Sequence, residues 1–532
     1  MRGALAPTLP RWQLVALAAL LVFAHVYVVD SAPHFLNPNQ ISRVHLTLAI
    51  AVDHKLSIDP YLKMLGTEDC STFGGHFYTD KSPGVSFWLA PFAWVLLGGG
   101  PHDTMTLPSY RELLYGLQIL GMALPTVVAW LALLPVLREW VGSPSRAAFI
   151  VLAGALGTNA LVYATHVFGV VPCAVSLFGA FLASRSAREP AHAATFAGPL
   201  RAALAGALAG LAFLFDPLAG FAVAVLGVHV VTGAPQRMRR AVGYAVGLAG
   251  PVALFLAYNR ACFGHPLETG IHHLVDPGYA EKYARGFHGF NRPTADGLFG
   301  LWLSGRRGML FLSPFLALAL PGWWRMWRDG DAKARADAVT CVAVTMAVSL
   351  FGMMSIDWTG GWSVGSRYLV PAIPFVLVGV ASALRPTEND RWLAFALGLA
   401  ISSTVALAMS EVTFAWFPNV FRNPVASLAW PLLRSGCVTS AYWIDGAKRA
   451  ALVSFVPHVV FATSLLVVFA LKGTAHRARQ AILALGFATF GGALFVLVPE
   501  PQGTLAERAQ MTARVRGFLD CAPNSPESFR VR

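Results

Sequence analysis

The stretch GGHFYTDKSPGVSFWLAP, residues 74–91, places a charged pair directly before a long apolar segment. Asp80 and Lys81 are followed by Ser82-Pro83-Gly84 and then by the apolar run. Lysine is scarce in this chain, whose basic residues are overwhelmingly arginine. Lys81 either anchors the segment at a membrane interface or offers a point charge to a lipid phosphate at headgroup depth. The stretch therefore marks a membrane boundary where chemistry could take place.

The composition of the whole chain is that of a membrane protein. Of 532 residues, 56% are hydrophobic and only 13% charged, whereas soluble domains carry about 25% charged residues. Apolar runs near the length of about 20 residues that a bilayer requires recur almost end to end. They are apolar on all sides, which favours helices over a β-barrel. The expected spans are residues 12–29, 82–98, 113–137, 146–164, 166–184, 200–215, 217–233, 241–258, 308–324, 336–355, 368–384, 392–412, 451–471 and 481–498.

The formal net charge of +13 does not indicate a nucleic-acid partner. The arginines cluster in short loops between the spans, and basic and aromatic residues do not interleave as in single-strand-binding proteins. Short basic loops are typical of the cytoplasmic side of a membrane. We therefore expect a cytoplasmic N-terminus, a multi-pass protein of the bacterial cytoplasmic membrane and no nucleic-acid partner. The basic loops are residues 236–240, 324–335, 385–391 and 472–479.

The fourteen candidate spans do not give a consistent topology. Starting from a cytoplasmic N-terminus, the strongly basic loop 236–240 falls on the outer side. Either one span between residues 113 and 233 is re-entrant or split, or a boundary is wrong. We expect about 13 crossings, with the long polar segments and the tail after Pro499 outside the cell. These segments are residues 30–81, 259–307, 356–367 and 413–450.

The outer loops hold the polar residues that could carry chemistry. Residues 41–53 have helical spacing and predict an amphipathic helix lying flat at the interface. Asp59 is fixed by the proline that follows it. Arg306 and Arg307 stand before a span, either as a clamp for an anionic headgroup or as interfacial anchors. Trp362, like Tyr368 further on, is either a membrane-belt residue or part of a sugar-stacking platform.

Seven motifs occur in an order that resembles the bacterial GT-C glycosyltransferases, and more narrowly those similar to protein mannosyltransferases and aminoarabinose transferases. The resemblance covers roughly residues 12–385. The motifs are SRxxLTxAI (42–50), SID (57–59), GHFYTDKSPG (75–84), YATxxFG (163–169), YNxxCFGxP (258–266), SGRRGMLFLSP (304–314) and GGWSxGSRYLVPAIPF (360–375).

The resemblance implies an all-α, GT-C-like bundle with large extracytoplasmic loops. It also implies inverting transfer of a sugar from a polyprenyl-phosphate donor to a lipid, glycan or protein acceptor. Lys81 matches the lysine that such enzymes place on the donor phosphate, with Ser82 where many relatives have proline. Many relatives carry a carboxylate pair after the first span, where this chain has Asn37 and Asn39.

That departure leaves the identity of the general base open. Asp59 is the first candidate and Asp80 the second, ahead of Asp30 and Asp69. We expect no cofactor, and no cluster has clear metal-ligand spacing, although acids near a phosphate could hold a divalent ion. The expected substrate-binding residues are Lys81, Arg43, Tyr78, Asn259, Arg306, Arg307, Trp362, Arg367 and Tyr368.

The chain is expected to divide into a catalytic module (1–385), additional helices (386–498) and a polar tail (499–532). Asp216-Pro217 is expected to be a helix-breaking turn, although an acid within a membrane is always a site candidate. Cysteines in the outer regions could form disulfides, and these are Cys70, Cys262, Cys437 and Cys521. The alternatives to an enzyme are a flippase or other transporter and a non-catalytic assembly protein.

Overall fold

A computed structural model describes residues 9–27, 29, 37–98, 106–189, 195–232, 236–286, 289–387, 390–439, 450–472, 474, 476–499 and 505–519. Within these residues the protein is a helical bundle whose one sheet is a two-stranded hairpin. The prediction of an all-α polytopic membrane protein is therefore confirmed.

Eight described helices are long and apolar enough to cross a membrane. Five shorter apolar helices, α1, α4, α7, α12 and the α19 segment, accompany them. These thirteen do not by themselves establish thirteen crossings. The long helices are α5–α6 (Pro108–Val141, with a π-helical turn at Gln118–Ala123), α9 (Val170–Arg188), α11 (Ala197–Phe215), α13 (Arg237–Phe263), α18 (Ala332–Met354), α20 (Arg391–Thr413), α22 (Val453–Leu471) and α23 (Arg477–Leu497). The shorter ones are α1 (Arg11–Tyr27), α4 (Gly84–Leu96), α7 (Pro144–Leu156), α12 (Gly220–Val231) and α19 (Ile373–Ala383).

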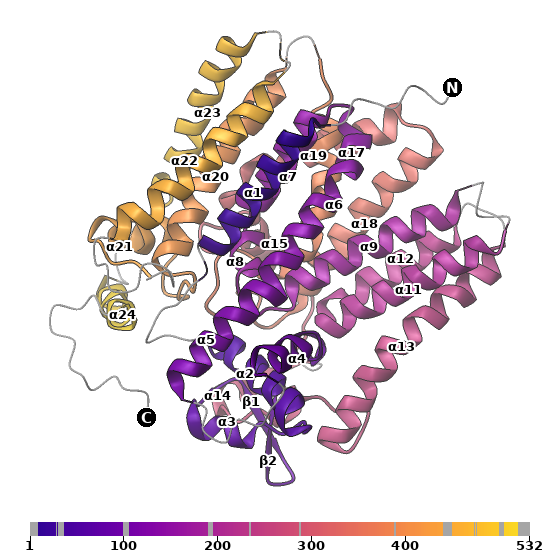
Figure 1. Ribbon diagram of the computed structural model, residues 1–532, viewed down its shortest axis with the longest axis vertical. Helices are drawn as coiled ribbons and strands as arrows, with labels where there is room; N and C mark the ends of the chain where they lie inside the picture. The colour runs from indigo at the N-terminus through magenta and orange to yellow at the C-terminus, as the bar shows by residue number, and fades with distance from the viewer. Residues whose placement is uncertain are drawn as a thin grey trace.

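The outer polar segments fold into small elements that gather at one end of the bundle (Figure 1). They include α2 (Pro38–Leu48), α3 (Asp59–Met64), strands β1 (Cys70–Phe73) and β2 (His76–Thr79), and α14 (Pro277–Ala284). The strands pair antiparallel, with Cys70 opposite Thr79. Gly74 and Gly75 form the hairpin turn with φ of 60° and 82°, a region that favours glycine.

The α2 helix differs from the predicted interfacial helix. The helix exists, but every residue from Asn39 to Leu48 is buried, so it does not lie flat at a surface. Ser42 on this helix shares a hydrogen bond of 2.6 Å with Thr79, and the Arg43 backbone carbonyl accepts one from Ser86 at 2.9 Å, whereas the ring nitrogens of His45 have no hydrogen-bond partner among the described residues. The prediction of a surface helix was therefore wrong, because neighbouring loop elements cover the polar face.

The α4 helix occupies the segment expected to form the second span. Its 13 residues extend for only about 20 Å, short of the hydrocarbon thickness of about 30 Å. It packs against α2, the π-helical turn at Ala49–Asp53 and α5 (Leu107–Leu117), at the end of the bundle that carries the loop elements (Figure 1). These contacts place α4 beside the loop elements and beside the start of the α5–α6 helix.

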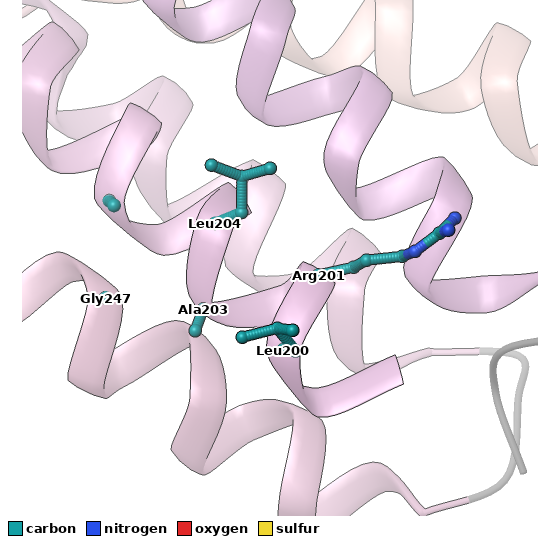
Figure 2. A pocket seen from close by; sticks show the side chains of 6 residues that line it. Leu200, Arg201, Ala203, Leu204 and Gly247 are labelled. Atoms are coloured by element: carbon teal, nitrogen blue, oxygen red, sulfur yellow. The ribbon is translucent and has the colours of Figure 1, made fainter. Parts of the chain in front are cut away.

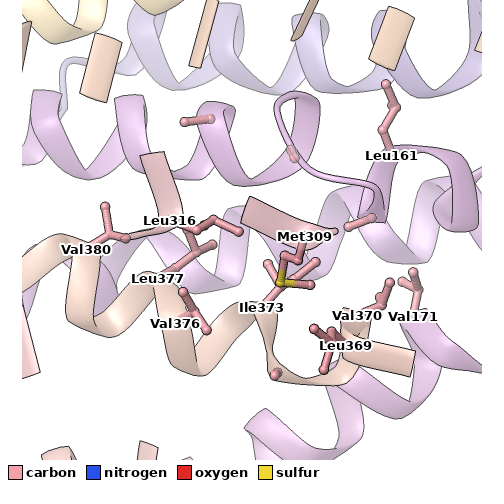
Figure 3. Packing of buried hydrophobic residues seen from close by; sticks show 14 of the residues in the cluster. Leu161, Val171, Met309, Leu316, Leu369, Val370, Ile373, Val376, Leu377 and Val380 are labelled. Atoms are coloured by element: carbon pink, nitrogen blue, oxygen red, sulfur yellow. The ribbon is translucent and has the colours of Figure 1, made fainter. Parts of the chain in front are cut away.

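The core of the bundle is a continuous set of buried aliphatic side chains. Figure 3 shows Met309, Leu369, Val370 and Ile373 interdigitating with residues of neighbouring helices. The predicted boundary between a module at 1–385 and additional helices at 386–498 falls within this core, since α20 packs on both α7 and α23. The three-part division stays a prediction.

Glycines allow α11 and α13 to approach closely. A Cβ on Gly206 would lie 2.8 Å from the Tyr244 carbonyl carbon, and one on Gly247 2.8 Å from that of Ala203. Small residues at helix contacts are typical of membrane bundles. Beside this contact lies an open apolar hollow of about 520 Å³, lined in part by Leu200 and Leu204 (Figure 2).

Candidate active site

The hairpin β1–β2 and the turn after it position Asp80 and Lys81. The backbone N–H of Ile58 donates to the Phe77 carbonyl at 2.8 Å, which ties the hairpin to the segment before α3. Beyond Lys81, the Ser82 hydroxyl donates to the Leu214 carbonyl at the end of α11. A Cβ on Gly84 would lie only 2.6 Å from the carbonyl carbon of Leu214, so only glycine allows this approach. The turn is thus fixed against the end of a membrane helix.

Lys81 lies between two carboxylates. Its Nζ is 2.6 Å from Asp80 Oδ2 and 3.0 Å from Asp69 Oδ2. The side chains are 18%, 8% and 19% exposed respectively, so all three are largely shielded from water. Because an ammonium group has three donors, one N–H remains for another acceptor.

Burial and the ion pairs act in opposite directions on these groups. Burial lowers the pKa of Lys81, but Asp69 and Asp80 outweigh it, so the pKa lies above its ordinary value and the lysine is charged at neutral pH. Burial raises the pKa of the Asp80 carboxyl against the opposing effect of Lys81. The second oxygen of Asp80, Oδ1, is buried and has no hydrogen-bond partner among the described residues. A carboxylate with a raised pKa and an unused oxygen is suited to accept a proton.

Two arginines lie beside this group. Arg43, on α2, is 6% exposed, and its Nη1 donates to the backbone and side-chain oxygens of Asn39. Burial lowers the pKa of Arg43 to about 10, against the opposing effects of Asp216 and Asp80, so it remains a cation at neutral pH. Arg367 comes from the segment before α19, and its guanidinium carbon lies 5.4 Å from the centroid of the Tyr368 ring. Segments more than 300 residues apart thus contribute cations to one place.

Asp216 supplies a third carboxylate. It follows the last residue of α11, accepts a hydrogen bond from the Leu218 N–H at 3.2 Å, and interacts electrostatically with Arg43, Arg367 and Lys81. The turn at Gly169 packs against the same helix end, since a Cβ there would lie 3.1 Å from the Phe215 carbonyl carbon. The residue at the expected helix-breaking turn, which the sequence also marked as a site candidate, therefore belongs to the charge cluster, which we define as Arg43, Asp69, Asp80, Lys81, Asp216 and Arg367.

The α14 helix borders the charge cluster. Lys282 pairs with Asp357 at 3.2 Å, and Asp357 also accepts a hydrogen bond from the Thr359 hydroxyl at 2.7 Å. Tyr279, on the same helix, interacts electrostatically with Asp69, Asp357 and Lys81. This helix of the second outer loop therefore reaches the residues of the first.

Asp59 does not join the charge cluster. One of its oxygens accepts the Phe77 N–H at 2.6 Å, and the other pairs with His76 at 2.8 Å. Although burial raises the pKa of Asp59, these two interactions outweigh it, and the pKa lies below its ordinary value. The carboxylate thus holds the hairpin to the start of α3.

Arg307 is not a member of the charge cluster, although it interacts electrostatically with Arg367. It is completely buried, and its guanidinium donates to the carbonyls of Thr359, Gly361 and Phe417 and to the Asn419 side chain, at 2.7 to 3.1 Å. Arg306 is only partly buried and gives Arg307 one carbonyl acceptor, at 3.1 Å.

The remaining expected substrate-binding residues lie around the loop elements. Asn259 donates to the Pro266 carbonyl at 3.2 Å, and the ring of Tyr78 lies edge-on to Phe263, with centroids 5.5 Å apart. The Trp362 ring lies 5.8 Å from the guanidinium carbon of Arg514, on α24 (Leu505–Phe518) in the C-terminal tail. Asp30 lies outside the described residues.

No group of three or more histidine, cysteine or acidic side chains is arranged to hold a metal ion in the described part of the chain. Cys70 and Cys262 are free thiols, whereas Cys437 is disulfide-bonded. Cys521 lies outside the described residues.

No protein-family model and no curated protein matches the sequence. Among solved structures, ArnT from Cupriavidus metallidurans bound to undecaprenyl phosphate is similar, with a TM-score of 0.49 and 16% identity over 94% of this chain and 80% of that one. The apo form of ArnT matches with a TM-score of 0.47 and 17% identity, over 90% of this chain and 77% of that one. The Archaeoglobus fulgidus oligosaccharyltransferase matches with a TM-score of 0.42 and 13% identity, over 92% of this chain and 60% of that one.

At identities of 13–17% and TM-scores of 0.42–0.49 these structures assign no role to this chain, and the function proposed below depends on the charge cluster.

Proposed function

We propose that this protein transfers a sugar from a polyprenyl-phosphate donor to an acceptor on the extracytoplasmic face of the membrane. The observation that carries the proposal is the charge cluster. It holds Lys81 and two arginines, largely shielded from water, at one end of a membrane helix bundle. Cations at headgroup depth suit a lipid phosphate, and the carboxylates beside them suit proton transfer.

In the proposed reaction, Asp80 is the general base. The acceptor hydroxyl gives its proton to Asp80 Oδ1 as its oxygen attacks the anomeric carbon. The bond between that carbon and the phosphate oxygen breaks, and the electron pair leaves with the polyprenyl phosphate. Lys81, Arg43 and Arg367 stabilise the charge that develops on the phosphate. Attack opposite the leaving group inverts the anomeric centre.

The proposed orientation places the charge cluster outside the cytoplasm, in a bacterial cytoplasmic membrane. If α4 stays with the loop elements and does not cross, one of the fourteen candidate spans is removed. The loop at 236–240 then lies on the same side as the N-terminus, as its positive charge requires. The surplus element is thus assigned to α4 rather than to the region between residues 113 and 233.

A lipid-binding measurement tests the proposal. The purified protein in nanodiscs is titrated with undecaprenyl phosphate, and undecaprenol without the phosphate serves as the matched control. We expect the phosphate form to bind at least tenfold more tightly, and Lys81→Gln to remove this preference while Lys81→Arg keeps part of it. Equal affinity for the two lipids would refute the proposed donor class.

A second measurement separates binding from chemistry. Asp80→Asn is expected to bind undecaprenyl phosphate at least as tightly as the wild type, because it removes a negative charge beside Lys81. The same variant is expected to transfer sugar at less than a hundredth of the wild-type rate, measured with polyprenyl-phosphate sugars on membranes that contain the native acceptor. Transfer at the normal rate would exclude Asp80 as the base.

A further inference from the structure

The ring of Phe168 contacts both arginines of the charge cluster. The guanidinium carbon of Arg43 lies 5.7 Å from its centroid, and that of Arg367 lies 5.9 Å from it. A cation within about 6 Å of a ring face is attracted by the ring quadrupole, most strongly where water is excluded. Phe168 and Arg43 are 2% and 6% exposed, whereas Arg367 is partly exposed.

The Phe168 ring is itself fixed by two other aromatic residues. Trp416 stacks on it with centroids 5.2 Å apart at an angle of 21°, and Tyr163 meets it edge-on at 5.3 Å. The Tyr163 hydroxyl donates to the Val364 carbonyl at 3.2 Å, three residues before Arg367. The ring therefore has little freedom to tilt away from the arginines.

Both arginines have ring contacts, and Arg43 in addition lacks a full set of hydrogen bonds. Arg43 Nε is buried without a hydrogen-bond partner among the described residues. Arg367 lies between the rings of Phe168 and Tyr368, and a Cβ on Gly360 would come within 2.9 Å of its Nε. Two like charges are thus held beside each other, although each disfavours the charged form of the other.

We propose that Phe168 is a positioning residue that holds Arg43 and Arg367 together so that both engage one phosphate group of the lipid donor. This inference rests on the proposed function. Phe168 touches neither the sugar nor the reacting atoms in this proposal, and acts only through the two guanidinium groups. Its quadrupole offsets part of the repulsion between them before the phosphate binds.

Substitutions that separate the quadrupole from the volume of the ring test the inference. Phe168→Leu and Phe168→Met keep an apolar side chain without a ring, whereas Phe168→Tyr keeps the ring. Phe149→Leu is the matched control, because Phe149 is a 1% exposed core phenylalanine on α7 that has no described contact with the charge cluster. Each variant is titrated with undecaprenyl phosphate and with undecaprenol, and its melting temperature is recorded.

We expect Phe168→Leu and Phe168→Met to weaken binding of undecaprenyl phosphate roughly tenfold. Undecaprenol binding should stay unchanged, and Phe168→Tyr should restore affinity to within threefold of the wild type. The effect should be smaller in the Arg43→Gln background, because only the contact between Phe168 and Arg367 then remains. Phe149→Leu should lower the melting temperature without changing the preference for the phosphate.

Two results would overturn the inference, and they differ from each other. In the first, the wild type prefers undecaprenyl phosphate and Arg43→Gln loses this preference, but Phe168→Leu and Phe168→Met both retain it. Phe168 would then have only a packing role. If the wild type shows no preference for the phosphate, the proposed function fails and the inference fails with it.

Discussion

Substitution of Arg307 by methionine separates a structural role from a donor-binding role. The guanidinium donates to four acceptors outside its own segment, on Thr359, Gly361, Phe417 and Asn419. Methionine fills much of the space but removes all four hydrogen bonds, and only the Thr359 and Phe417 carbonyls keep another donor, from Ser363. At about 1 kcal/mol for each lost hydrogen bond, the free energy of unfolding should fall by about 4 kcal/mol.

Thermal unfolding in detergent measures this loss, and the transfer rate per folded molecule measures the effect on chemistry. We expect Arg307→Met to lower the melting temperature by several degrees, and Arg306→Met, the control beside it, to lower it much less. Folded Arg307→Met protein should retain most of its affinity for undecaprenyl phosphate. An unchanged melting temperature combined with loss of phosphate binding would show that Arg307 contacts the donor and would refute this reasoning.

Three further outcomes follow from the site. Asp59→Asn should loosen the hairpin, seen as faster amide exchange at Phe77, yet reduce the transfer rate less than tenfold; complete loss of transfer would make Asp59 the base. The transfer rate should fall as the pH falls through the raised pKa of Asp80, because only the ionised carboxylate accepts a proton, and a midpoint at or below the ordinary aspartate value would argue against Asp80. Gly84→Ala should displace the turn from Leu214 and weaken both stability and lipid binding, so wild-type behaviour in both assays would contradict the close packing.

The apolar runs predicted most of the helices because a bilayer imposes a length and an all-round apolar surface on a crossing helix. The same criterion assigned α4 as a span, and hydropathy alone does not separate a crossing helix from an apolar helix that stays with the loop elements, as we propose for α4. The polar pattern of α2 indicated an interfacial helix because the spacing of polar residues does not show which parts of the protein cover them. Sequence spacing does not show that Thr79, 37 residues beyond Ser42, covers the polar face.

Lys81 was singled out because a rare residue type stands at a span boundary within a resembling motif, and its contact with a donor phosphate stays a proposal. Asp216 gave a weaker signal, as an acid within a membrane, because an acid followed by proline after an apolar run is also typical of a helix cap. Its electrostatic interactions with Arg43 and Arg367 arise only when α2, the end of α11 and the segment before α19 come together. The contact of Phe168 with two arginines could not be predicted either, because nothing in the sequence distinguishes its ring from those of the other phenylalanines, 35 in all.

The charge balance of the cluster explains why a carboxylate beside the phosphate site favours the proposed reaction. Asp69, Asp80 and Asp216 oppose Arg43, Lys81 and Arg367, so the ionised cluster has no net charge. As the sugar leaves, the phosphate changes from a diester with one negative charge to a monoester with two. Asp80 takes up the proton of the acceptor in the same step and loses its own charge. Because the two changes cancel, the buried site keeps the same total charge throughout, which avoids the large cost of creating an uncompensated charge away from water.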